Sequence, residues 1–74
     1  MDTRHLKAFL KIADTGSISR AAESLGIAQP SLSQQLLRLE DEVGTALFRR
    51  TPRGVALTEA GRGFSGNNQR VLQA

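Results

Sequence analysis

The chain has 74 residues, no cysteine and a net charge of +3, from ten Lys and Arg against seven Asp and Glu. This length suits one small domain, whose core must come from aliphatic side chains and three phenylalanines, because no disulfide or thiolate metal site is possible. The sequence has no signal-peptide pattern and no apolar run near the ~20 residues of a membrane helix, so we expect a cytoplasmic protein with no membrane contact. With one histidine and no carboxylate–histidine cluster, we expect no enzyme, no catalytic residue, no metal and no other cofactor.

Residues 2–14 predict a first helix, which Asp2 or Thr3 can cap. Apolar residues recur along it with helical spacing, at Leu6, Phe9, Leu10 and Ala13. A second face is basic, with Arg4, Lys7 and Lys11. We interpret the two lysines as solvated, His5 as a surface or boundary residue, and Arg4 as a phosphate contact.

A second helix is predicted from Ser17 to Ser24 or Leu25, followed by a turn at Gly26 and a third helix. Ala22 is small where two helices would cross closely, and Gly26 suits a turn with a positive φ. Apolar residues that would pack beneath this corner are Leu25, Ile27, Leu32 and Leu36. The spacing is typical of a helix-turn-helix, whose second helix commonly enters a DNA major groove. Ser17 is either a helix cap alone or also a phosphate contact.

The third helix is predicted from about Gln29 to Val43, with Pro30 in its first turn and Gly44 as its stop. One side is apolar, with Leu32, Leu36, Leu39 and Val43, and the opposite side is polar, with Pro30, Gln34 and Asp41 flanked by Ser31, Ser33, Leu37 and Arg38. Since Asp41 would repel phosphate, we expect residues 29–38 to form the DNA-reading surface.

Several side chains on this surface suit base edges. The glutamines can pair with adenine, the serines can reach several edges, and Arg38 can contact guanine or a phosphate. Pro30 and Leu37 can each contact a thymine methyl group. For Leu37 an alternative stays open, namely packing at the edge of the core.

Residues 47–50 and 55–57 flank a turn that contains Pro52 and Gly54, which predicts a small hairpin. A hairpin after a helix-turn-helix is a wing, so we expect a mainly α winged helix-turn-helix. Its tip residue Arg53 could enter a narrow minor groove. Arg49 and Arg50 alternate in direction, so only one of them is expected to face DNA, and we expect that one to be Arg50. Their clustering apart from Glu40, Asp41 and Glu42 favours one phosphate-facing side over an ordinary solvated surface.

Thr58 is predicted to cap a final helix, with Glu59 placed favourably for its dipole. Phe64, Val71 and Leu72 keep a sparse apolar pattern along this helix. Gly61, Gly63 and Gly66 are poor helix formers.

The chain resembles the N-terminal DNA-binding domain of LysR-type transcriptional regulators over residues 6–61. The matching residues are Gly16-Ser17, Ala21-Ala22, Leu25, Gln29-Pro30, Ser33, Leu39-Glu40, Gly44, Leu47-Phe48-Arg49-Arg50 and Leu57-Thr58-Glu59-Ala60-Gly61. Two positions depart from the pattern, because Gln34 and Leu37 stand where relatives often carry a basic residue. Residues 63–68 are also less apolar than the linker helix of relatives usually is.

The resemblance implies a three-helix core with a β-hairpin wing at residues 48–57, in a DNA-binding domain of residues 1–58. Residues 59–74 would begin a linker helix used for dimerisation. It further implies a homodimer or tetramer that binds A·T-rich interrupted inverted repeats in double-stranded DNA, with an effector-sensing domain that is absent from this chain. The residues expected to contact DNA are Arg4, Ser17, Gln29, Pro30, Ser31, Ser33, Gln34, Arg38, Arg50 and Arg53. Protein association without DNA is the competing hypothesis.

Overall fold

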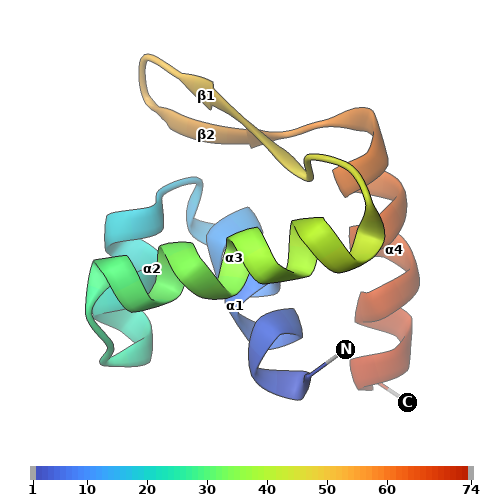
Figure 1. Cartoon of the computed structure of the whole chain (residues 1–74), viewed down its shortest axis with the longest axis horizontal. Coiled ribbons are helices and arrows are strands. Elements are labelled where there is room, and N and C mark those ends of the chain that lie inside the picture. Colours follow the sequence, from blue (N-terminus) through green and yellow to red (C-terminus); the bar gives the residue numbers. More distant parts are fainter. Residues whose placement is uncertain (1, 74) are drawn as a thin grey trace.

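The computed structural model describes the backbone of residues 2–73 and the side chains of residues 2–66. The helices are α1 (Thr3–Thr15), α2 (Ile18–Leu25), α3 (Gln29–Val43) and α4 (Glu59–Gln73), and the strands are β1 (Phe48–Thr51) and β2 (Gly54–Leu57). Helices α1, α2 and α3 pack on one another, with the β1–β2 wing along one side of α3 and α4 at its far end (Figure 1). This is the mainly α winged helix-turn-helix that the sequence predicts.

Local capping signals set the helix starts. The Asp2 carboxylate accepts a hydrogen bond from the backbone N–H of Arg4 at 2.9 Å, and the Ser17 hydroxyl accepts one from the N–H of Arg20 at 3.2 Å. Helix α3 has no side-chain cap, but Pro30 occupies its first turn, where a missing N–H has no cost. The predicted starts of these helices are confirmed.

The helix ends are also those expected from the glycines. Gly26 has a φ of 69° and Gly44 a φ of 87°, and the N–H of each donates back to the last turn of the helix before it. The left-handed turn at Gly26 therefore reverses the chain between α2 and α3, as predicted.

The core lies where α1, α2 and α3 meet. Its largest side chains that are less than 2% exposed are Phe9, Ile12, Leu32, Leu39 and Leu47. In α1 the buried side is shifted around the helix from the predicted stripe. Ala8 and Ile12 are buried, whereas Leu10 and Ala13 are only half-buried. The reason is that α1 contacts α2, α3 and α4 rather than a single neighbour.

Val43, which the sequence places on the apolar side of α3, is 38% exposed, so the buried side does not reach the end of the helix. Val43 is the last residue of α3, and the chain turns away at Gly44. Leu47, which follows this turn and has no exposed surface, joins the core instead.

Three phenylalanines connect the wing and α4 to this core. The ring of Phe9 lies 5.2 Å from that of Phe48 and 5.1 Å from that of Phe64, the second pair being edge-to-face. Phe9 on α1 therefore contacts both the start of β1 and α4. Val71 and Leu72, the other members of the predicted apolar pattern, lie outside the described side chains.

The segment between α3 and β1 is fixed by two side chains from distant parts of the sequence. The Glu40 carboxylate accepts hydrogen bonds from the N–H groups of Leu47 at 2.6 Å and Phe48 at 3.3 Å. The Thr58 hydroxyl donates to the carbonyl of Ala46 at 2.7 Å and accepts from the N–H of Gly61 at 3.0 Å, so it also caps α4 as predicted. The root of the wing is thus tied to both α3 and α4.

Strands β1 and β2 pair antiparallel, with Phe48 opposite Leu57 and Thr51 opposite Gly54. The wing also contacts the α1–α2 corner, where the N–H of Val55 donates to the carbonyl of Gly16 at 3.1 Å. Gly54 has a φ of 140°, and a Cβ there would lie 2.3 Å from the Gly16 carbonyl oxygen. The wing therefore has a set position relative to the helix-turn-helix.

No helix within residues 2–73 has both the length and the apolarity required to cross a bilayer. Across the same described part of the chain, no group of three or more His, Asp or Glu side chains is arranged to hold a metal ion.

Candidate nucleic-acid interface

The first two and a half turns of α3 present a polar surface to solvent. Leu32, Leu36 and Leu39 face the core with at most 6% of their surface exposed. On the outer side, the exposed residues of this half are Gln29, Pro30, Ser31, Gln34, Leu37 and Arg38, and Ser33 is half-buried. The predicted division of α3 into a buried apolar side and an outward polar side is confirmed for residues 29–39.

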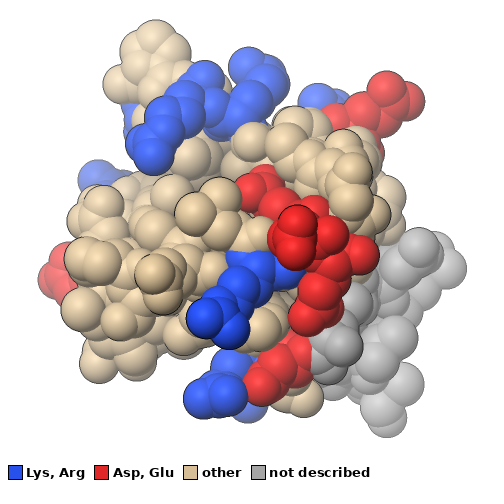
Figure 2. Space-filling view, viewed as in Figure 1, with Lys and Arg blue, Asp and Glu red and all other residues tan. Residues whose placement is uncertain are grey.

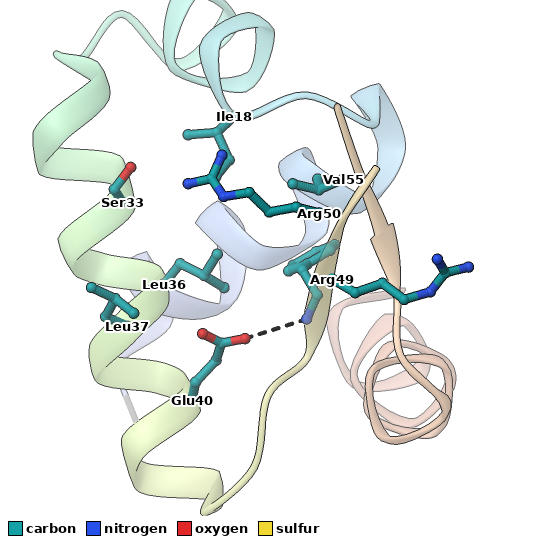
Figure 3. A pocket seen from close by; sticks show the side chains of 9 residues that line it. Ile18, Ser33, Leu36, Leu37, Glu40, Arg49, Arg50 and Val55 are labelled. Carbon is teal, nitrogen blue, oxygen red and sulfur yellow. Dashed lines mark hydrogen bonds between the residues drawn. The ribbon is translucent and has the colours of Figure 1, made fainter. Parts of the chain in front are cut away.

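A groove of about 200 Å³ separates this surface from the wing. Its walls come from α3, from β1 and β2, and from Ile18 at the start of α2 (Figure 3). Leu36 and Val55 give it apolar walls, while Ser33 and Arg50 are polar. The groove places side chains from four elements around one strip of surface.

Arg49 and Arg50 point to opposite sides of the wing, as their alternation on β1 requires. Arg50 extends over the groove toward Ile18, whereas Arg49 extends away from α3 (Figure 3). Of these two exposed arginines, Arg50 therefore lies on the same side as the reading surface. Arg53 is exposed at the tip of the wing, where its N–H donates to the Thr51 hydroxyl at 3.3 Å.

A second depression, of about 220 Å³, lies on the other side of α3, against the start of α1. It brings Arg4 and His5 of α1 together with Ser31, Gln34 and Arg38 of α3. Arg4 and Arg38 are thus the two cationic side chains lining one hollow, although 34 residues separate them in the sequence. His5 is half-buried, as expected for a boundary residue, and its buried Nδ1 has no hydrogen-bond partner.

Arg4 also forms an ion pair within α1. Its guanidinium lies 3.0 Å from the Asp2 carboxylate, and Arg4 is 80% exposed. The hydrogen bond from the Arg4 side chain, helped by the Arg4 backbone N–H, lowers the pKa of Asp2 from 3.8 to about 2. The same pairing raises the pKa of Arg4. Of the two arginines that line the hollow, Arg4 therefore has its charge partly neutralised by Asp2.

Ser17 is the N-cap residue of α2, which is a structural role. Besides capping α2, its hydroxyl lies 3.1 Å from that of Ser19. The half-buried Ser17 and the exposed Ser19 are both at the N-terminal end of α2, beside the groove wall formed by Ile18.

Charge is distributed unevenly over the face that carries α3. Figure 2 shows basic side chains over the wing and across the middle of α3, and acidic ones over the C-terminal part of α3. The N-terminal part of α3 is uncharged from Gln29 to Leu37. A polyanion can therefore approach the first half of α3 and the wing without meeting a carboxylate until Glu40 and Asp41.

The sequence does not reveal the structural role of Glu40, which it shows as one of three clustered acidic residues and as part of the matching pair Leu39-Glu40. Its carboxylate faces the root of the wing rather than open solvent (Figure 3). Because α3 ends at Val43, between Glu40 and Leu47, helical periodicity does not relate these two residues, and no local pattern could reveal their contact. The hollow between α1 and α3 was missed for the same reason.

Comparison with known proteins gives one consistent result. Residues 3–62 match the model of the bacterial regulatory helix-turn-helix proteins of the lysR family. The chain is 53% identical over 72 residues to the HTH-type transcriptional regulator BudR of Klebsiella aerogenes, covering 97% of this chain and 50% of that protein. It is 55% identical over 62 residues to the nitrogen assimilation regulatory protein nac of Escherichia coli, covering 84% of this chain and 20% of that protein. The chain thus spans half or less of the length of these two relatives.

Solved structures agree with the sequence relatives. The DNA-binding domain of BenM in complex with benA site 1 DNA superposes with a TM-score of 0.93 at 38% identity, over 99% of this chain and 85% of that one. The DNA-binding domain of CbnR in complex with DNA gives the same TM-score at 37% identity, over 99% and 84% of the two chains. The fold is therefore that of domains solved on DNA.

Proposed function

Because the chain belongs to the lysR family of bacterial regulatory helix-turn-helix proteins, we propose that it binds double-stranded DNA in a sequence-specific manner to regulate transcription. The proposal has α3 in the major groove and the β1–β2 wing at the adjacent minor groove. The observation that carries it is the uncharged, exposed polar surface of α3 from Gln29 to Gln34, flanked by arginines and free of carboxylates. The DNA complexes of the BenM and CbnR domains, which share this fold, support it.

The proposed roles follow from where the side chains lie. The proposed base-reading residues are Gln29, Pro30, Ser31, Ser33 and Gln34. Arg38 and Arg4, which line one hollow, would hold a phosphate on one side of α3. Arg50 and Ser17 would hold a phosphate on the other side, and Arg53 would reach into the minor groove.

We further propose that residues 1–58 are the DNA-binding unit and that residues 59–74 begin a dimerisation helix. In the whole protein this domain would act in the cytoplasm as part of a homodimer or tetramer on A·T-rich interrupted inverted repeats. An effector-sensing domain outside this chain would control it. The domain itself would have no enzymatic activity.

The test begins with selection of a preferred duplex from a random pool. A good bidentate contact between a glutamine and adenine supplies about 1–3 kcal/mol of discrimination. Gln29→Ala or Gln34→Ala should therefore weaken binding to the selected duplex while leaving binding to a scrambled one nearly unchanged. Arg53→Ala should weaken binding to both duplexes alike. Equal losses on both duplexes for the glutamine variants would refute their role as base readers.

A salt titration separates DNA binding from the alternative, in which the domain associates only with proteins. Affinity for the duplex should fall with a log–log slope of about −0.9 for each phosphate contacted. Arg38→Ala should reduce this slope by about 1. An affinity independent of salt would favour an apolar protein contact instead.

A further inference from the structure

Leu37 is the most exposed large apolar side chain among those that the structure describes. It is 63% exposed, and Val43, at 38%, is the other large apolar residue that is freely exposed in this described part. A leucine on the solvent side of a helix contributes nothing to the core. This exposure excludes the possibility that Leu37 packs at the core edge, since a residue in that role would be mostly covered.

Leu36, the neighbour of Leu37 in α3, is the residue that packs in the core at this turn of the helix. It is 6% exposed and points into the space between α3 and the wing (Figure 3). Leu37 is also one of the residues that line this groove, as is Arg50 on β1. The two adjacent leucines thus face different surroundings, one the protein interior and the other solvent.

The position of Leu37 on α3 is part of the reading surface. It lies three residues after Gln34 and four after Ser33, so it shares their side of the helix one turn further along. One turn beyond Leu37 on this side is the exposed Asp41, which would repel the DNA backbone. Leu37 and its neighbour Arg38 therefore end the part of α3 that can approach a base before the surface becomes acidic.

We propose that Leu37 reads the C5-methyl group of a thymine in the major groove, an inference that rests on the proposed DNA binding. Thymine is the base that presents a methyl group there, and apolar side chains recognise it by contact. Cytosine lacks this methyl group, and guanine and adenine present polar atoms, so an exposed leucine discriminates against them by leaving those atoms without a partner. A basic residue at this position could bind a phosphate or a guanine, whereas Leu37 would select a thymine.

The experiment uses this chain and a duplex selected from a random pool, in which each thymine is replaced singly by deoxyuridine. That replacement removes only the methyl group. Burial of one methyl group corresponds to about a fourfold change in affinity. At one thymine, we expect replacement by deoxyuridine to lower the affinity of the wild-type chain about fourfold. The affinity of Leu37→Ala should not change at that position. Leu37→Met, which retains an apolar side chain of similar length, should keep part of the discrimination.

Two variants are matched controls. Val43→Ala truncates the other exposed aliphatic residue of α3 but lies outside the reading half, so its pattern of uracil effects should equal that of the wild type. Pro30→Ala should change the response at a different thymine, at the N-terminal end of the helix. Since Leu37 and Val43 are both exposed, neither truncation should disturb the fold.

The outcomes are distinct. If a duplex is selected but every thymine responds to uracil equally in the wild type and Leu37→Ala, the inference is overturned while DNA binding stands. If Leu37→Ala instead weakens self-association without altering the uracil pattern, Leu37 belongs to a protein contact. Failure to select any preferred duplex would overturn the proposed function itself, and the role of Leu37 with it.

Discussion

Asp2 is held in its ionised form by the residue two positions along the chain. Its pKa of about 2 lies below the ordinary value of 3.8, mainly because the Arg4 side chain donates hydrogen bonds to it. A carboxylate whose pKa is lowered by folding contributes stability above its unfolded pKa, and this contribution is lost as the pH falls. The cap on α1 should therefore persist at pH 4 and above and be lost as the pH falls through about 2.

Arg4→Ala should raise the pKa of Asp2 toward 3.8. It should not restore that value fully, because the backbone N–H of residue 4 still donates at 2.9 Å. An NMR titration of the Asp2 carboxyl in both chains measures this directly, with Lys7→Ala as the control expected to have no effect. An unchanged Asp2 pKa in Arg4→Ala would show that the ion pair does not persist in solution.

Glu40 contributes to the stability of the fold through the hydrogen bonds that its carboxylate accepts from two backbone N–H groups. Glu40→Ala leaves the N–H groups of Leu47 and Phe48 without this carboxylate. Hydrogen bonds to a charged group contribute about 1.5–3 kcal/mol, so the free energy of unfolding should fall by about that amount. Glu40→Gln, which keeps one acceptor oxygen, should lose less. Urea unfolding measures the free energy of unfolding of both variants. Asp41→Ala is the control, because it removes an exposed acidic neighbour and should leave this free energy unchanged. A similar loss in Asp41→Ala would mean that the effect comes from net charge instead.

At the scale of elements, the approach of α4 to the wing root depends on a missing side chain. A Cβ on Gly61 would lie 2.1 Å from the carbonyl oxygen of Leu47, whereas one on Gly63 meets nothing within 4 Å. Gly61→Ala should therefore force α4 away and lower the free energy of unfolding by about 1–3 kcal/mol.

Gly63→Ala is the matched control on the same helix, and it should raise stability by up to about 1 kcal/mol, because alanine favours the helix interior. Denaturation midpoints of the two variants should consequently shift in opposite directions. A shift in the same direction for both would mean that α4 does not pack against the wing root as described.

The sequence predicts those helix ends that are fixed by interactions between residues close together in the chain. Ser17, Gly26 and Pro30 fix helix ends through neighbours within a few residues, so the starts of α2 and α3 follow from the sequence. The contacts of Glu40 with Leu47 and of Gly16 with Val55 join segments whose meeting depends on the folded chain. For the same reason the outward side of α3 could be predicted, but the hollow shared by Arg4 and Arg38 could not.

On the scale of the whole molecule, one aromatic side chain connects all the parts. Phe9 is fully buried in α1, within 5.2 Å of the Phe48 ring and 5.1 Å of the Phe64 ring. Because the core is small, the helix-turn-helix, the wing and α4 share it rather than having separate interiors. We therefore expect the domain to unfold in one cooperative transition.

Phe9→Ala tests this expectation. Removing a buried phenylalanine side chain costs about 3–5 kcal/mol, against a total of roughly 4–11 kcal/mol for a domain of this length. The variant should lose most of its stability, with amide signals of α3, the wing and α4 disappearing at one denaturant concentration, as measured by NMR. Leu37→Ala, which removes an exposed side chain, should stay within about 0.5 kcal/mol of the wild type. If α4 alone unfolds in Phe9→Ala while α1–α3 stay folded, the last helix is instead a separate folding unit that packs on the winged helix-turn-helix without sharing its stability.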